Sequence, residues 1–166
     1  MKAANLSSEV FDAFPLARNE ARRAYPLVRL FHPNLSLNQW LHHVQILRRK
    51  SSGVIAIQDK RGCVHATFVY TVDVRVARAP LLRVSEMMVW RMLGNLVNQA
   101  IMDCIDRLAI ETDSETIEIS LPSAVEYAVD PIWRNSLKEA GFRVRTTSMI
   151  RRLAPGSNAG EHGNAT

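Results

Sequence analysis

The chain has 166 residues, of which 47% are hydrophobic and 22% charged, so it holds enough apolar material for one ordinary domain with its own core. Its formal net charge of +5 favours anionic partners, a class that includes phosphate-bearing ligands, nucleic acids and acidic membrane surfaces. The basic residues are scattered rather than gathered into one block. That scatter argues against a dedicated nucleic-acid surface.

Cysteines and apolar runs exclude further classes. Cys63 and Cys104 lack the spacing of a zinc site or a redox pair, so we interpret both as reduced packing residues and expect no metal site. No run of about 18 apolar residues occurs, and no cationic start leads into an apolar segment. We therefore expect no signal peptide, no membrane span and no membrane partner. The expected location is the cytoplasm.

Both ends of the chain are poor in apolar residues. Residues 1–8 are small and polar, and residues 154–166 combine proline and three glycines with almost no apolar side chain. This composition predicts a flexible N-terminus and a disordered C-terminal tail. Residues 9–153 contain neither an internal repeat nor a linker, and they are predicted to form a single domain.

The first half of this domain is predicted to contain a strand, two helices and a hairpin. Residues 10–16 indicate a short strand, and residues 19–31 a helical stretch that Pro26 should kink or divide. Ser36 and Gln39 form a capping-box pattern at the start of a second helix, whose apolar face should lie on the core. An antiparallel hairpin follows, with its strands at residues 54–58 and 63–75.

The second half alternates strands and helices. Residues 81–90 indicate a buried strand, residues 94–110 an amphipathic helix, and residues 117–121 another strand. A strand, a helix and a strand in series require a parallel pair with a crossover connection. Asp130 and Pro131 predict the start of a last helix through Ala140, with Gly141 in the left-handed position that ends it. Two short strands, at residues 142–145 and 147–153, complete the order.

Three features belong together: the order of elements, the segment at residues 91–96 (RMLGNL) and the segment at residues 137–142 (LKEAGF). In combination they resemble the GNAT (general N-acetyltransferase) superfamily across nearly the whole domain, and the chain looks like a divergent member. Residues 91–96 (RMLGNL) stand between strand and helix where the family has its [Q/R]-x-x-G-x-[G/A] loop. Residues 137–142 (LKEAGF) resemble the family's terminal-helix signature, which ends in Gly-Phe. The resemblance implies an α/β (α+β) fold: a mixed, mostly antiparallel sheet of six to seven strands with helices on both faces.

The resemblance also implies acetyl-CoA or coenzyme A as the cofactor. The start of a helix presents unpaired N–H groups and a positive dipole end, which suit a pyrophosphate. Gly94 would allow close approach, Arg91 would add charge, and backbone groups of the preceding strand would pair with the pantetheine arm. The implied cofactor-binding residues are Met88, Val89, Arg91, Met92, Leu93, Gly94, Asn95 and Leu96.

Two residues are candidates for catalysis. Glu86 matches a frequent acidic position of the family's central strand, where a carboxylate can deprotonate the acceptor amine. The alternative reading, a carboxylate paired with Arg83 or another arginine, stays open. The family's proton-donating tyrosine aligns with Leu137, which cannot donate a proton. Ser136 and Tyr127 are nearby in sequence, and of these we select Tyr127.

The histidines carry weaker signals. His42 and His43 are adjacent on a predicted helix, where consecutive side chains point in different directions, so they are poor joint metal ligands. We interpret both as solvated or half-buried. His65, on a hairpin strand, is interpreted as a surface histidine.

The implied function is transfer of an acetyl or similar acyl group from acetyl-CoA to a primary amine by direct attack in a ternary complex. The acceptor, a small molecule or a peptide, is left open by the sequence, as is a homodimer formed through edge strands. Leu96, Leu137 and the short connection at Trp90 support an alternative, a catalytically inactive GNAT-fold binding or regulatory module. A nucleic-acid-binding domain rests on charge alone and ranks last.

Overall fold

The computed structural model describes residues 10–49, 51–74, 76–90, 95–120 and 131–143. The expected domain boundaries, at residues 8/9 and 153/154, lie outside these ranges. Among the described helices, none is long and apolar enough to cross a membrane. The elements in chain order are β1 (Phe11–Pro15), α2 (Ala21–Phe31), α3 (Leu37–Leu47), β2 (Ser52–Asp59), β3 (Val64–Asp73), β4 (Leu81–Val89), α4 (Asn95–Glu111), β5 (Thr116–Ile119) and α5 (Pro131–Glu139).

The described strands form one mixed sheet in the order β1-β2-β3-β4-β5. The first four strands pair antiparallel, whereas β4 and β5 are parallel and are joined by α4, as the strand-helix-strand series predicts. The described residues thus form five strands where six to seven were expected. Of the two remaining predicted strands, only Phe142 and Arg143 lie within the described residues, and neither belongs to a strand.

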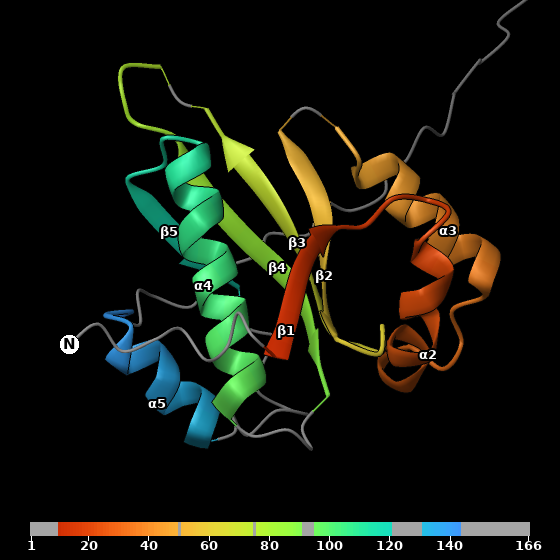
Figure 1. Cartoon of the computed structure of the whole chain (residues 1–166). Coiled ribbons are helices and arrows are strands. Elements are labelled where there is room, and N and C mark those ends of the chain that lie inside the picture. The colour runs from red at the N-terminus through yellow and green to blue at the C-terminus, as the bar shows by residue number, and fades with distance from the viewer. Residues whose placement is uncertain (1–9, 50, 75, 91–94, 121–130, 144–166) are drawn as a thin grey trace, which may run out of the picture.

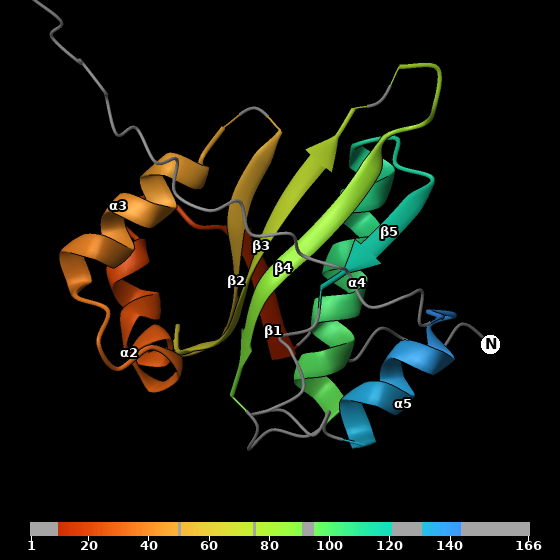
Figure 2. The same ribbon diagram turned by 180° about the vertical axis from the view of Figure 1, so that it is seen from behind.

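Helices cover both faces of the sheet (Figures 1 and 2). One core cluster joins the sheet to α4 and α5, and its largest fully buried side chains include Phe68, Ile101 and Ile105. A second cluster joins the opposite face to α2 and α3, centred on Trp40 and Val44. The sheet is therefore the middle layer of three, as the resemblance implies.

The predicted capping box is present at the start of α3. The Oγ of Ser36 accepts the N–H of Gln39 at 3.2 Å, and the Oε1 of Gln39 accepts the N–H of Ser36 at 2.8 Å. The expected division of the preceding helix does not occur, because α2 continues through Pro26 to Phe31. Pro26 is exposed, and so is Arg22, whose carbonyl loses its helical donor; water can replace that bond.

The two later helices also match their predicted positions. Gly141 has a φ of 84°, its N–H donates to the Lys138 carbonyl at 3.0 Å, and the Phe142 N–H donates to the Leu137 carbonyl at 2.9 Å. This pair of hydrogen bonds is a Schellman motif, which ends α5 as expected. Leu96, the first apolar residue after the start of the predicted amphipathic helix at residues 94–110, is 43% exposed rather than buried on the core face.

The reason lies in helical geometry. Leu96 shares its side of α4 with Gln99 and Asp103, three and seven residues on, whereas the buried stripe follows Val97 and Ile101.

Candidate active site

Strand β4 contains a bulge at its centre. The register with β3 shifts between two pairs, Val69–Ser85 and Thr67–Met88, so β4 carries one extra residue in this stretch. Glu86 lies in the bulge with a φ of 49°, in the left-handed region that L side chains rarely adopt. Such a conformation costs on the order of 1–3 kcal/mol and persists only where its surroundings hold it. The predicted catalytic carboxylate thus lies at a locally strained point of the sheet.

The partner of Glu86 is a histidine from the opposite layer. The Nε2–H of His43, on α3, donates to the Oε2 of Glu86 at 2.9 Å. The alternative pairing with Arg83 is not seen: that guanidinium lies 3.7 Å from the carboxylates of both Asp73 and Glu118. His43 and Glu86 are 37% and 50% exposed as side chains, so the pair is open to solvent on one side.

The imidazole of His43 lies beside the ring of a buried tryptophan. Its ring centroid lies 6.1 Å from that of Trp40, one turn earlier on α3. Trp40 is 1% exposed, and its indole N–H donates to the Ala21 carbonyl of α2 at 2.8 Å. His42 is exposed, and His43 is half-buried, as the sequence indicates. The contact between His43 and Glu86 was not predicted, because nothing in local spacing relates two residues 43 positions apart.

Next to this pair, β4 and β5 part. Their parallel register ends at Val84 and Ile119, and the Ser120 N–H donates to the Val84 carbonyl at 2.8 Å. Strand β4 continues to Val89, and none of the described residues of β5 pairs with this last part. Glu86 therefore lies two residues beyond the point of separation.

The backbone beyond the bulge divides its hydrogen bonds between two sides. The Trp90 N–H donates to the His65 carbonyl at 2.7 Å, and Met88 lies opposite Thr67 in the antiparallel ladder. Because successive residues of a strand direct their N–H and C=O groups to opposite sides, those of Val89 point away from β3. Of the two strand residues expected to meet a cofactor, Val89 has its peptide groups on the open side and Met88 faces β3.

The predicted phosphate-binding loop is described only at its end. Residues 91–94 and Tyr127 lie outside the described residues, so their predicted roles stay predictions. Helix α4 begins at Asn95 and has no acidic side chain in its first turn. The partial positive charge of its first N–H groups is therefore not offset by a local carboxylate, and this end of the helix fits an anionic group.

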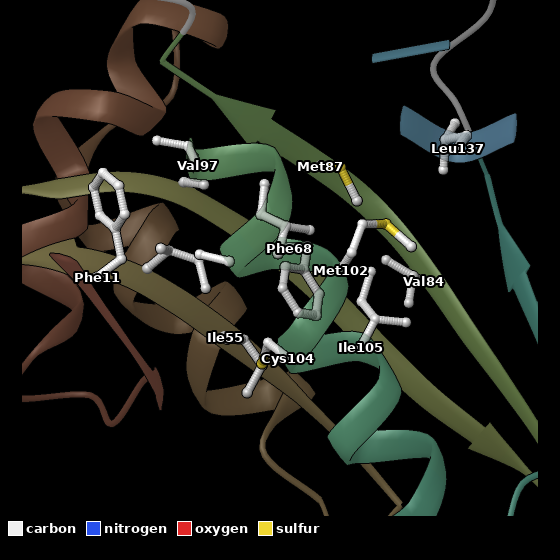
Figure 3. Packing of buried hydrophobic residues seen from close by; sticks show 14 of the residues in the cluster. Phe11, Ile55, Phe68, Val84, Met87, Val97, Met102, Cys104, Ile105 and Leu137 are labelled. Atoms are coloured by element: carbon white, nitrogen blue, oxygen red, sulfur yellow. The ribbon is translucent and has the colours of Figure 1, made fainter. Parts of the chain in front are cut away.

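Leu137 fills the core at the position that aligns with the family's tyrosine. Its side chain is 8% exposed and belongs to the cluster between the sheet and α4 (Figure 3). Ser136 beside it is half-buried. This position supplies apolar packing and no proton donor, as the sequence indicates.

A second histidine–carboxylate pair closes the β2–β3 turn. The Nε2–H of His65 donates to the Oδ2 of Asp59 at 2.9 Å, while the Oδ1 of Asp59 accepts the N–H groups of Arg61 and Cys63, each at 2.9 Å. These hydrogen bonds lower the pKa of Asp59, and the bond from His65 contributes most to the lowering. Both oxygens of this carboxylate are occupied by the turn, which gives the pair a structural role.

Comparison with known proteins rests on structure alone, because no family model and no curated sequence matches the chain. The ribosomal-protein-alanine N-acetyltransferase of Brucella melitensis biovar Abortus matches with a TM-score of 0.67 and 14% identity, over 87% of this chain and 99% of that one. The chain has the GNAT acetyltransferase fold. Glucosamine-6-phosphate N-acetyltransferase of Arabidopsis thaliana also has the GNAT fold, with a TM-score of 0.64 and 12% identity over 87% of this chain and 99% of that one.

A third neighbour with the GNAT fold was solved with coenzyme A. Aminoglycoside N-acetyltransferase AAC(6')-Iy matches with a TM-score of 0.67 and 10% identity, over 86% of this chain and 94% of its own. The likeness extends over nearly the full length of each neighbour, so the GNAT fold accounts for the domain as a whole.

Proposed function

We propose that the protein is an acetyl-CoA-dependent N-acetyltransferase that acylates a primary amine by direct attack in a ternary complex. The observation that carries this proposal is the separation of β4 from β5 beyond Val84, with Glu86 at the bulge beside it. The separation leaves the peptide groups of Val89 directed to the open side, and an extended ligand rich in amides can pair with such a strand edge. The pantetheine arm of coenzyme A is a ligand of this kind.

The cofactor would be held at two places. The pyrophosphate would lie against the N-terminal turn of α4, where Met92, Leu93, Gly94, Asn95 and Leu96 would offer backbone N–H groups. Arg91 would add a cation near the phosphates. Val89 would align the pantetheine arm, whereas the peptide groups of Met88, the other strand residue expected to do so, are directed to β3. Bound acetyl-CoA would supply an acyl thioester, whose carbonyl carbon accepts the amine and whose sulfur leaves.

The protein's own contribution to the chemistry would come from β4. An acceptor amine arrives protonated at neutral pH, and the carboxylate of Glu86 would take its proton directly or through water. A backbone N–H of β4 would stabilise the oxyanion that develops on the carbonyl oxygen. Tyr127 is proposed as the proton donor to the departing sulfur, since Leu137 cannot fill that role.

The acceptor class follows from the neighbours rather than from the site. Their names include a ribosomal-protein alanine, aminoglycosides and glucosamine 6-phosphate, all of which carry a primary amine. We therefore propose a small-molecule or peptide amine as the acceptor of this protein too. The wide range among proteins of one fold means that the acceptor has to be found by screening.

A second candidate function is favoured by one observation. Leu137 is buried in the core where the family has its proton donor, and this packing supports a GNAT-fold module that binds without catalysing. The two candidates make different predictions for acetyl transfer, because only the enzyme turns over.

The deciding experiment is calorimetric titration of acetyl-CoA and desulfo-CoA into the purified protein, repeated with Gly94→Trp. The indole should fill the space that the pyrophosphate needs, so micromolar binding by the wild type should be lost. The matched control is Gln45→Trp, which places the same side chain on the exposed face of α3 and should leave binding unchanged.

Binding that Gly94→Trp abolishes would support the cofactor site and justify a screen of amines with mass spectrometry of the products. Binding without transfer to any amine would favour the non-catalytic module. If neither ligand binds, the proposed activity is wrong, and the GNAT fold would serve another binding role.

A further inference from the structure

The hydrogen bond between His43 and Glu86 joins two layers of the fold at the proposed reaction centre. Glu86 comes from the bulge of β4, and His43 comes from α3, which packs on the opposite side of the bulged strand from α4. Among the described residues, the recorded contacts of the Glu86 carboxylate consist of this bond alone, made by its Oε2. Within the described part of the chain, no hydrogen bond or ion pair involves its Oε1.

Each partner is held by its own framework. The left-handed φ of 49° fixes the direction in which the Glu86 side chain leaves β4. The ring of His43 lies beside Trp40, which is buried and bonded to the Ala21 carbonyl. Without such a bond, a half-exposed glutamate side chain samples many rotamers. The bond from His43 restricts Glu86 before any substrate arrives.

We propose that His43 is a positioning residue for the acyl transfer, a role that rests on the proposed function. Its Nε2–H holds the Oε2 of Glu86, and this contact directs Oε1 to the acceptor ammonium. Preorganisation of this kind acts on the reaction rate, since the base is aligned in advance rather than at the moment of proton transfer.

With a primary ammonium as the acceptor, the reaction begins with proton transfer. Oε1 of Glu86 takes one proton, which frees the nitrogen lone pair to form the N–C bond with the acyl carbon. The C–S bond breaks, and its electron pair stays on the sulfur of coenzyme A. The thiolate takes up a proton, and the second proton lost by the nitrogen replaces it, so the products are the amide, the free thiol and the protonated carboxyl group of Glu86.

The contact itself can be tested in the protein without substrate. In Glu86→Leu, the ring resonances of His43 should shift, while those of His42, which is exposed on the same helix, should stay in place. Unchanged His43 resonances would show that the pair does not exist in solution and would overturn the proposal.

The kinetic test uses three substitutions and one acceptor of each class named among the neighbours. These acceptors are the aminoglycoside sisomicin, glucosamine 6-phosphate and a peptide with N-terminal alanine. His43→Leu removes the donor and should lower kcat by roughly tenfold to a hundredfold, with the KM for acetyl-CoA within about twofold of wild type. His43→Gln keeps an N–H donor and should recover much of the loss. His42→Leu is the matched control and should behave as wild type.

A double-mutant cycle separates positioning from a general structural effect. If His43 acts through Glu86, adding His43→Leu to Glu86→Gln should cause no further loss of kcat. A full additional loss in the double variant would overturn the positioning role, as would a fully active His43→Leu in an active wild-type background. A wild type that binds acetyl-CoA but acetylates none of the amines would instead overturn the proposed function, and this inference with it.

Discussion

The indole N–H of Trp40 donates to the backbone carbonyl of Ala21 and so joins α3 to α2 inside the core. Ala21 is 0% exposed and Trp40 is 1% exposed, so the bond lies out of reach of water. A buried indole N–H without an acceptor would cost free energy, and the Ala21 carbonyl removes that cost while the ring fills space. The two helices therefore pack as one layer, and this layer carries His43 to the edge of the proposed active site.

The first prediction concerns the buried face of α3. Leu41→Asp would place a carboxylate in the apolar cluster around Trp40 and Val44. We expect a loss of roughly 3 kcal/mol or more of unfolding free energy, enough to unfold a marginal domain. Circular dichroism melting measures it, with Gln45→Asp on the exposed face as the control. A native melting curve for Leu41→Asp would show that this face is not buried.

The second prediction concerns a buried hydroxyl. The Oγ1 of Thr67 is buried, and no hydrogen-bond partner for it is found among the described residues. Thr67→Val exchanges this hydroxyl for a methyl group of similar size, so we expect stabilisation by about 1 kcal/mol. Urea unfolding measures the difference. Thr71→Val, at an exposed position of the same strand, should change stability little; equal effects at both sites would point to strand propensity instead.

The third prediction concerns pH. Hydrogen bonding from His65 and from the turn lowers the pKa of Asp59 below its usual value of 3.8, so the ionised form is favoured in the folded protein. Its stabilisation is fully present above the pKa of the unfolded chain and is lost as pH falls through the folded value. Wild type should therefore lose its stability advantage over Asp59→Asn below about pH 4. Urea unfolding across this range measures it, and a constant difference would contradict the assignment.

The fourth prediction concerns the two thiols. Cys63 is exposed, whereas Cys104 is buried, and burial raises the pKa of the Cys104 thiol to about 11. One thiol should react rapidly with Ellman's reagent at about pH 8, and the second only after unfolding. Cys63→Ser should remove the rapid phase. Rapid labelling that persists in this variant would mean that Cys104 is accessible.

Much of the architecture follows from local sequence. Ser36 and Gln39 cap α3 because both groups of the box lie within one helical turn, and Gly141 ends α5 because it adopts the left-handed conformation without strain. The parallel pairing of β4 with β5 follows from the intervening helix. Each of these features depends on residues within one helical turn or on elements that follow one another along the chain. The sequence pattern therefore predicts them.

The geometry around Glu86 was decided by tertiary structure. Its partner is His43 rather than Arg83, because the bulge turns the carboxylate toward α3 while Arg83 lies between Asp73 and Glu118. Strand alternation predicts which face a side chain takes only while the register is regular. The sequence by itself determined the order of the described elements from β1 to α5, the caps and the candidate carboxylate. Only the folded sheet decided which side chain meets that carboxylate, because such contacts depend on a register shift and on helix packing that no local pattern encodes.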